Sequence, residues 1–238
     1  MRASIARYWD LVAPRYLELF RHEFDSKPYD CQLLASFAAC LPAGARVCDA
    51  GCGPCGHVAH LVASAGAEAG LRLEVTGIDI SPDCVELARR EQPALHFETM
   101  DMVAMNFPDE WFAGLVCYYA LHSLPRRAHA RVFAEFARVL MNGGLLLLAL
   151  KESSSAGEMG KTEPGEGNAS EGWIDDPMGT GERVFWCDFE VDQLRELLVA
   201  SGFEVLDCTV RDPVPGEIAV RRIYLSARRR AASNQNAA

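Results

Sequence analysis

Apolar residues follow two alternating patterns along this chain, one of helical period and one of short runs. Spacings of three and four positions predict helices at residues 3–24, 29–41, 57–65, 125–141 and 189–201. The sequence Ser81-Pro82-Asp83 predicts a further helix start, with an N-cap followed by proline at the first helical position. Short apolar or alternating runs predict strands at residues 47–50, 71–80, 95–100, 112–119, 145–150, 203–210 and 218–226.

Strands alternate with helices as far as residue 150. That alternation is typical of a doubly wound α/β fold with a mostly parallel sheet. The last two predicted strands have no helix between them, so we expect them to form a terminal antiparallel hairpin. Two helices precede the first strand, within residues 1–43, where the resemblance described below implies an N-terminal helical cap.

Three interruptions qualify the pattern. Pro14 falls inside the first helical stretch, so a kink or two separate helices are expected there. Gly66 is expected to end the helix that starts at residue 57, and Asn142-Gly143-Gly144 is expected to end the one that starts at 125.

The segment between residues 152 and 184 differs from the rest of the chain, with eight acidic residues against Lys161 and Arg183, and seven glycines. It is too polar to predict core packing. Two interpretations stay open: a solvated, partly disordered loop, or a lid over the strand ends that closes with its aromatic residues.

Composition excludes several classes of protein. The chain has 238 residues and a formal net charge of −10, and its basic clusters are short, so nucleic-acid binding has little electrostatic support. No apolar run approaches the roughly 18 residues of a membrane span and no signal peptide is recognisable, so we expect a soluble, cytoplasmic protein. Among the nine cysteines, the lone pair Cys52 and Cys55 is a weak zinc signal, and no metal is expected.

Candidate chemistry gathers where predicted strands end. The first strand ends in Asp49-Ala50-Gly51-Cys52-Gly53, the second in Gly77-Ile78-Asp79-Ile80, and the third in Met100-Asp101-Met102. Ligands of open α/β sheets bind at these carboxyl ends. Glycines let a ligand approach the backbone closely, and an aspartate can accept hydrogen bonds from two ribose hydroxyls.

This series resembles the class I S-adenosylmethionine-dependent methyltransferases, in particular their small-molecule branch. The resemblance covers nearly the whole chain and rests on five motifs in order: the Tyr8 and Tyr16 region, 47–53, 75–82, 119–125 and 138–144. It implies a Rossmann-like seven-stranded sheet, mostly parallel with a terminal antiparallel strand. It also implies a single domain over residues 1–238, made up of the cap, a cofactor-binding core (46–151), the acidic lid (152–186), and a C-terminal helix and hairpin (187–230).

The resemblance further implies S-adenosylmethionine as cofactor, with S-adenosylhomocysteine as product, and direct in-line methyl transfer to a small molecule. The cofactor-binding residues would be Tyr16, Asp49, Gly51, Cys52, Gly53, Asp79, Ile80, Asp101, Met102 and Tyr118. Two positions depart from the family pattern: Cys55 replaces a glycine of the first loop, and Asn142 replaces the proline of a Pro-Gly-Gly.

Two alternatives stay open. Gly51, Gly53 and Gly56 also satisfy the dinucleotide fingerprint G-x-G-x-x-G, so an NAD(P)-dependent oxidoreductase is the competing enzyme. Asp49 disfavours it, because a carboxylate there would repel a pyrophosphate, whereas it suits the ammonium of a methionine moiety, directly or through water. A non-catalytic module that only binds S-adenosylmethionine is the other alternative.

On the acceptor side, four residues are singled out. His122 follows the fourth strand, where a general base would stand, although a structural histidine is equally expected. Tyr119, Trp173 and Trp186 are expected to contact the substrate. Neither the acceptor nor the oligomeric state can be predicted from the sequence.

Overall fold

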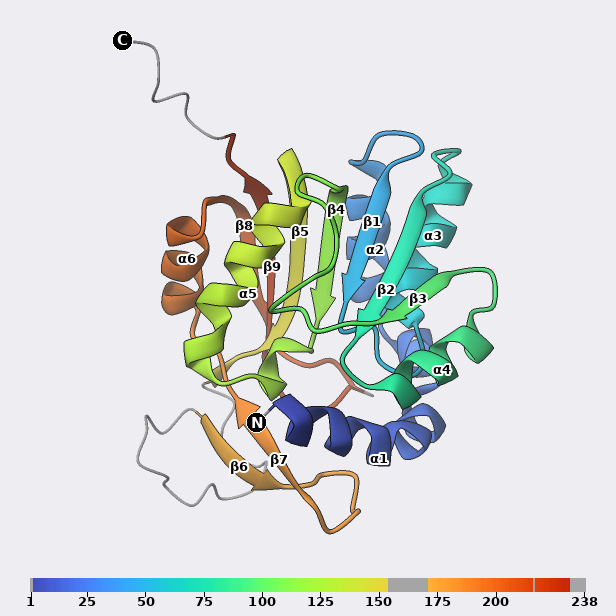
Figure 1. The fold of residues 1–238 in the computed structure, drawn as a ribbon, viewed down its shortest axis with the longest axis vertical. Helices are drawn as coiled ribbons and strands as arrows, with labels where there is room; N and C mark the ends of the chain where they lie inside the picture. Colours follow the sequence, from blue (N-terminus) through green and yellow to red (C-terminus); the bar gives the residue numbers. More distant parts are fainter. Residues whose placement is uncertain (1, 154–170, 216, 232–238) are drawn as a thin grey trace.

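The structure, a computed structural model, describes residues 2–153, 171–215 and 217–231. A seven-stranded sheet forms its centre, in the order β3-β2-β1-β4-β5-β9-β8 (Figure 1). Its strands are β1 (Arg46–Ala50), β2 (Glu74–Asp79), β3 (His96–Thr99), β4 (Phe112–Tyr118), β5 (Leu140–Lys151), β8 (Phe203–Arg211) and β9 (Arg222–Arg229). Strands β1 to β5 pair in parallel. Strand β9 runs antiparallel to both of its neighbours, β5 and β8, and is the one strand of this sheet whose direction is reversed. The predicted fold class is confirmed, including the terminal antiparallel hairpin.

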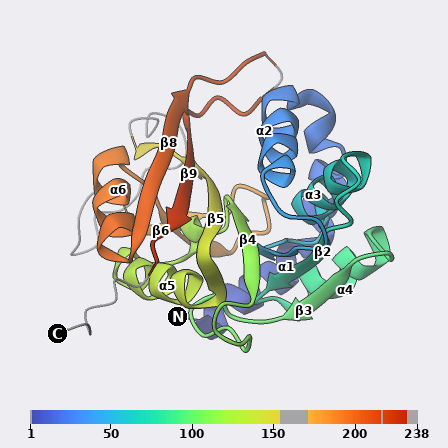
Figure 2. The ribbon, with the colours of Figure 1, turned by 90° about the horizontal axis from the view of Figure 1, so that it is seen from above.

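Helices cover both faces of the sheet (Figure 2). They are α1 (Arg2–Phe20), α2 (Pro28–Ala39), α3 (His57–Glu68), α4 (Pro82–Glu91), α5 (Arg126–Val139) and α6 (Val191–Ala200), with short 3₁₀ turns η1 (Glu23–Ser26) and η2 (Leu121–Ser123). One apolar cluster joins the sheet to α2, α3 and α4, and another joins its opposite face to α5 and α6. The parallel strands are therefore buried on both sides, which explains their nearly continuous apolar sequences.

Helix α1 excludes one of the two expectations at Pro14, that of two separate helices. It is one helix from Arg2 to Phe20 with Pro14 inside it. Pro14 removes one backbone hydrogen bond, whereas Val12, Ala13 and Leu17 on either side of it are buried, and most helix stability in proteins comes from such packing. The 3₁₀ turn η1 then leads into α2.

Both glycine stops were also placed wrongly. Helix α3 continues through Gly66 to Glu68. A Cβ atom at residue 66 would approach the side chain of Leu73 to 2.6 Å, so glycine is there for close packing and does not end the helix. The chain instead turns at Gly70, whose φ is +73°. Strand β5 begins at Leu140 and so includes the expected stop at residues 142–144.

The acidic segment contains structure that its composition did not predict. Strands β6 (Glu171–Asp175) and β7 (Arg183–Cys187) form a separate two-stranded antiparallel sheet. Buried Ile174 and Val184 of this hairpin pack against Tyr8 and Val12 of α1. The remainder of the predicted lid, residues 154–170, lies outside the described residues.

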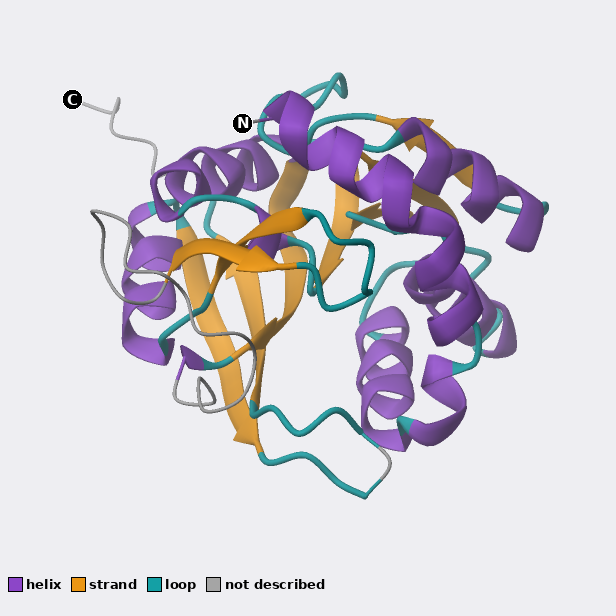
Figure 3. Ribbon diagram, turned by 90° about the horizontal axis from the view of Figure 1, so that it is seen from below, coloured by secondary structure: helices purple, strands orange, loops and turns teal. Residues whose placement is uncertain are grey.

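Helix α1 and the β6–β7 hairpin both lie below the carboxyl ends of the parallel strands (Figures 1 and 3). The Tyr8 hydroxyl joins them by donating to Oδ1 of Asp176 at 2.5 Å. Asp176 also accepts the backbone N–H groups of Met178 and Thr180, so it holds the hairpin turn as well. The edge of the sheet at which α/β folds bind ligands is thus covered from below.

We predict that Gly77→Ala destabilises the protein by about 1–3 kcal/mol, the usual cost of overpacking a core. A Cβ atom at Gly77 in β2 would lie 2.5 Å from the buried ring of Phe97. Gly172→Ala in β6 is the matched control, because no heavy atom lies within 4 Å of its added Cβ. Urea unfolding measures both variants, and equal stabilities would contradict the packing argument.

Candidate active site

A pocket opens at the carboxyl ends of β1 to β4, where the strand order changes direction. The loops after these strands form one wall, and side chains of α1 and η1 form the other. The pocket therefore lies at the topological switch point, the expected place for a ligand in an open α/β sheet.

The loop after β1 depends on glycine at two positions for different reasons. Gly51 has φ +83°, and a Cβ atom there would approach Cβ of Ala120 to 2.2 Å. Gly53 has φ +60°, and no heavy atom lies within 4 Å of where its Cβ would be, although the residue lines the pocket. Gly51 is thus required for packing, whereas Gly53 exposes backbone to the pocket.

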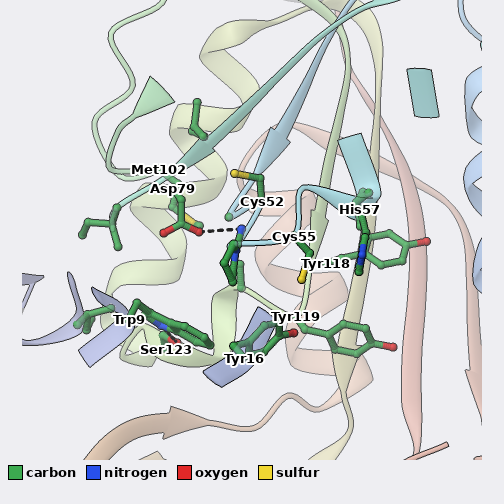
Figure 4. Close-up of a pocket in the computed structure, with 18 of the residues that line it drawn as sticks. Trp9, Tyr16, Cys52, Cys55, His57, Asp79, Met102, Tyr118, Tyr119 and Ser123 are labelled. Carbon is green, nitrogen blue, oxygen red and sulfur yellow. Dashed lines mark hydrogen bonds between the residues drawn. The ribbon is translucent and has the colours of Figure 1, made fainter. Parts of the chain in front are cut away.

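Asp79, at the end of β2, connects two loops. Its Oδ2 accepts the N–H of Gly53 at 3.0 Å and its Oδ1 accepts the N–H of Ser81 at 2.9 Å (Figure 4). Burial raises the pKa of this carboxyl to about 6, although both hydrogen bonds act in the opposite direction. Each oxygen keeps a second lone pair, so the carboxylate can still accept hydroxyl donors from the pocket.

Asp49 lies in β1 and is not part of the pocket wall. Its Oδ2 accepts the N–H of Ala59 at 3.0 Å, and its buried Oδ1 has no partner among the described residues. Burial raises the pKa of Asp49 to about 7. A contact between Asp49 and a ligand ammonium stays a prediction.

The loop after β3 closes one end of the pocket. Ile80, Asp101 and Met102 line it, as does Met100. Asp101 accepts the N–H of Val103 at 3.0 Å through Oδ1 and is ion-paired with Arg2 of α1, whose Nε lies 3.2 Å from Oδ2. This ion pair attaches the start of α1 to the pocket rim.

Both walls carry aromatic rings. Trp9 and Tyr16 project from α1, with ring centroids 5.7 Å apart, and Tyr119 lies on the strand side, directly after β4 (Figure 4). The indole of Trp9 donates to Oγ of Ser123 at 3.2 Å, which joins α1 to η2. Tyr118 also lines the pocket, and its buried hydroxyl has no hydrogen-bond partner among the described residues.

Of the predicted cofactor residues, nine line this pocket and Asp49 does not. The nine are Tyr16, Gly51, Cys52, Gly53, Asp79, Ile80, Asp101, Met102 and Tyr118. The sequence interpretation missed Trp9, Phe24, His57 and Ser123 as pocket residues. Trp9 lies on the apolar face of the first helix, where no local motif distinguishes a core residue from a wall residue.

His122 does not fit the predicted role of general base. Its ring is fully buried and does not line the pocket. Nδ1–H donates to the carbonyl of Cys187 at 2.6 Å, and Nε2 accepts the N–H of Lys151 at 2.8 Å. Both ring nitrogens are therefore occupied, and burial lowers the pKa of the ring to about 3. The geometry corresponds to the structural alternative.

The two tryptophans predicted to contact substrate also lie outside the pocket wall. The ring of Trp186 stacks on His122, with centroids 4.8 Å apart, and its indole donates to Asp188. Trp173, which is itself exposed, packs edge-on against the buried ring of Phe185. Of the predicted substrate residues, only Tyr119 is at the pocket.

Neither a metal site nor a membrane span is found within the part of the chain that the structure describes. No three residues among its His, Cys, Asp and Glu gather so as to hold a metal ion. No helix in residues 2–153, 171–215 and 217–231 is both long and apolar enough to cross a membrane.

Comparisons with known proteins agree with this geometry. Residues 47–144 match the family described as "Methyltransferase domain". Trans-aconitate 2-methyltransferase of Methylobacterium nodulans is 34% identical over 116 residues, which are 48% of this chain and 41% of that protein. An S-adenosyl-L-methionine-dependent Diels-Alderase of Talaromyces variabilis is 34% identical over 133 residues, 52% of this chain and 42% of that protein. The chain thus spans less than half the length of these curated relatives.

Solved structures show the same fold. A SAM-dependent methyltransferase of Methanosarcina mazei superposes with a TM-score of 0.69 at 22% identity, covering 81% of this chain and 95% of that one. The [4+2]-cyclase SpnF superposes with a TM-score of 0.61 at 21% identity, covering 85% of this chain and 80% of that one.

We predict that acidification reduces the stability of the wild type more than that of a His122→Asn variant. The folded state keeps the ring neutral down to a pKa of about 3, whereas the unfolded ring takes up a proton below about 6.5. Between these values the wild type loses up to about 1.4 kcal/mol per pH unit through this residue, and asparagine loses none.

Urea unfolding at pH 7, 6 and 5 measures the difference. The raised pKa values of Asp49 and Asp79 act with the opposite sign, but they are common to both proteins and cancel in the comparison. His60→Asn, on the exposed face of α3, is the control, because it replaces an imidazole that is not buried. A pH-independent difference between His122→Asn and wild type would mean that the ring of His122 is not held neutral.

Residues 47–144 match the methyltransferase domain family, and the strand order and the pocket at the strand ends agree with the resemblance to the class I S-adenosylmethionine-dependent methyltransferases.

Proposed function

We propose that the protein binds S-adenosylmethionine in this pocket and transfers its methyl group to a small-molecule acceptor. The observation that carries the proposal is the hydrogen bond between Gly53 and Asp79 at the switch point. This bond holds the carboxylate of Asp79 beside the exposed backbone of Gly53. One ligand can then place its ribose against the carboxylate and the chain attached to the ribose against the backbone.

The residues present fit the cofactor. Asp79 would accept the ribose hydroxyls, and Met102 and Asp101 would contact the adenine end. The unpartnered Oδ1 of Asp49 and the unpartnered hydroxyl of Tyr118 are buried polar atoms that lack a hydrogen bond among the described residues. Because such atoms destabilise a fold, a polar ligand that reaches them directly or through water supplies a missing interaction.

When bound, the sulfonium of S-adenosylmethionine supplies the activated methyl group. The protein's part is to orient and to exclude water. The rings of Trp9, Tyr16 and Tyr119 wall the pocket, and aromatic faces favour a cation while keeping water away. Holding the acceptor about 3–3.5 Å from the methyl carbon then provides most of the rate gain.

The two alternatives are tested by the same measurements. An oxidoreductase would bind NAD, and Asp79 alone does not discriminate, because it would hold either ribose. A module that only binds the cofactor would show affinity without turnover. The matched methyltransferase family favours the transfer reaction over both.

We predict that Asp79→Ala weakens binding of S-adenosylhomocysteine by about 10- to 100-fold, as expected when hydrogen bonds to a charged group worth about 1.5–3 kcal/mol are lost. Isothermal titration calorimetry measures this, with NAD as the control ligand that should not bind. Asp192→Ala, an exposed acid in the first turn of α6, is the control variant and should bind normally. Wild-type affinity in Asp79→Ala, or binding of NAD alone, would reject the assignment.

A further inference from the structure

A chain of hydroxyl groups leads from the pocket wall to a buried carboxylate. Tyr119 lines the pocket, and its Oη lies 3.4 Å from Oη of Tyr224 in β9. Tyr224 in turn donates to Asp30 of α2, with both carboxylate oxygens at 3.0 Å. Asp30 is completely buried, so this chain connects the pocket with an acid that has no solvent contact.

The direction of these hydrogen bonds is fixed by counting donors. A tyrosine hydroxyl has one proton and two acceptor positions. The proton of Tyr224 goes to Asp30, and Nη2 of Arg211 donates to the Tyr224 oxygen at 3.2 Å. Tyr119 must therefore be the donor to Tyr224, which leaves the oxygen of Tyr119 free to accept a proton from a ligand.

The backbone of Tyr119 is held in an unusual conformation. Its φ is +55°, in the left-handed region that residues other than glycine rarely adopt, and its N–H donates to the carbonyl of Ala149 at 2.8 Å. Such strain persists where the surrounding structure requires it, commonly at functional sites. In Figure 4 the hydroxyl of Tyr119 points away from Asp79.

The charges on the wall restrict what the acceptor is. Glu23, Asp79 and Asp101 line the pocket, and no lysine or arginine is among its described lining residues. Two of these acids are ion-paired with basic groups that are not themselves lining residues, Glu23 with Lys27 and Asp101 with Arg2. A polycarboxylate in the pocket would be repelled by these carboxylates and would find no lysine or arginine on the wall to pair with. A neutral or cationic molecule would not be repelled.

We propose that the acceptor is a neutral or cationic molecule whose nucleophile carries a proton, a hydroxyl or an amine, and that Tyr119 removes this proton through Tyr224 and Asp30. The inference rests on the proposed methyl transfer. As the nucleophile bonds to the methyl carbon, the carbon–sulfur bond breaks and sulfur keeps the electron pair. The acceptor's proton moves to Tyr119, the proton of Tyr119 to Tyr224, and that of Tyr224 to Asp30.

The charges balance over this step. The sulfonium becomes a neutral thioether while the Asp30 carboxylate becomes a neutral acid, so a separated pair of charges is removed. After the product leaves, the reverse relay through the same hydroxyls returns the proton to water in the pocket. Tyr119 is thus the catalytic residue, and Tyr224 and Asp30 are positioning residues that act through it.

The surroundings of Asp30 suit a group that changes charge. Burial raises its pKa, and the cations Lys27 and Arg211 oppose that effect without cancelling it. The other titratable groups around it come from four places in the fold: Cys31 on α2, Tyr118 and Tyr119 at the end of β4, Tyr224 on β9, and Glu217 between β8 and β9. Asp30 is therefore neither fully paired nor exposed, as a proton acceptor requires.

The first experiment separates this inference from the proposed function. Formation of S-adenosylhomocysteine is measured with a panel of phenols and primary amines, led by catechol and phenethylamine, and with trans-aconitate as the carboxylate probe. Turnover of a phenol or amine supports the inference. Turnover of trans-aconitate alone, or no turnover in a protein that binds S-adenosylhomocysteine, overturns it. Failure to bind S-adenosylhomocysteine would instead reject the proposed function.

The second experiment tests the relay with the active phenol or amine. Tyr224→Phe and Asp30→Asn should each lower kcat at pH 7 by about 10²-fold, the lower end for a general base, with affinity for S-adenosylhomocysteine within twofold of wild type. The deficit should shrink as the pH approaches the acceptor's own pKa, about 10 for a phenol, because the deprotonated acceptor needs no base. Tyr29→Phe is the control, since that ring packs against Tyr224 with centroids 4.9 Å apart. A loss that is equal at every pH, or the same loss in Tyr29→Phe, would show a merely structural role.

Discussion

The close approach of the β1 loop to the end of β2 is the constraint on which the rest of this site depends. The N–H groups of Gly51 and Cys52 both donate to the carbonyl of Ile78, and that of Gly53 donates to Asp79. These bonds require the left-handed backbone of Gly51 and Gly53. Ala120 leaves no room for a side chain at Gly51. Once the loop is held there, the carboxylate of Asp79 and the exposed backbone of Gly53 face the same volume, so one ligand can contact both.

The same constraint explains why α1 is part of the site. A pocket at the edge of an open sheet has only one wall from the strands and their loops. Here α1 supplies the second wall and is joined to the first by Arg2–Asp101, by Ser81 donating to Asp10, and by Trp9–Ser123. These polar contacts are few and small, and a surface ion pair contributes little to stability. Ile5, Tyr8 and Val12 of α1 also lie in apolar clusters, so apolar packing rather than these polar contacts holds the second wall in place.

Sequence alone predicted the sheet and its glycine loop, because both depend on local rules: strand–helix alternation, and glycine where backbone must come close. Nine of the ten residues it predicted for the cofactor line the pocket for the same reason, since they lie at or directly after strand ends or on the first helix. His122, Trp173 and Trp186 lie outside the pocket wall, because their positions depend on contacts between distant segments. The ring nitrogens of His122 are hydrogen-bonded to the backbone of Lys151 and Cys187, which lie 29 and 65 positions further along the chain. It also missed the β6–β7 hairpin, whose buried residues are too few to produce a period in an acidic, glycine-rich background.

The contact between Asp30 and Tyr224 also depends on segments that are distant in sequence. They are separated by 194 positions in the chain and come together only because β9 inserts between β5 and β8, beside α2. Neither belongs to a local motif. What Asp30 shares with Asp49 and Asp79 is a carboxyl group whose charged form burial disfavours. Of these three acids, Asp79 lines the pocket, so a cation bound there would stabilise its charged form, and binding to the folded state alone shifts the folding equilibrium toward that state. The same electrostatics would favour a positively charged ligand over an anionic one, in agreement with the acceptor proposed above.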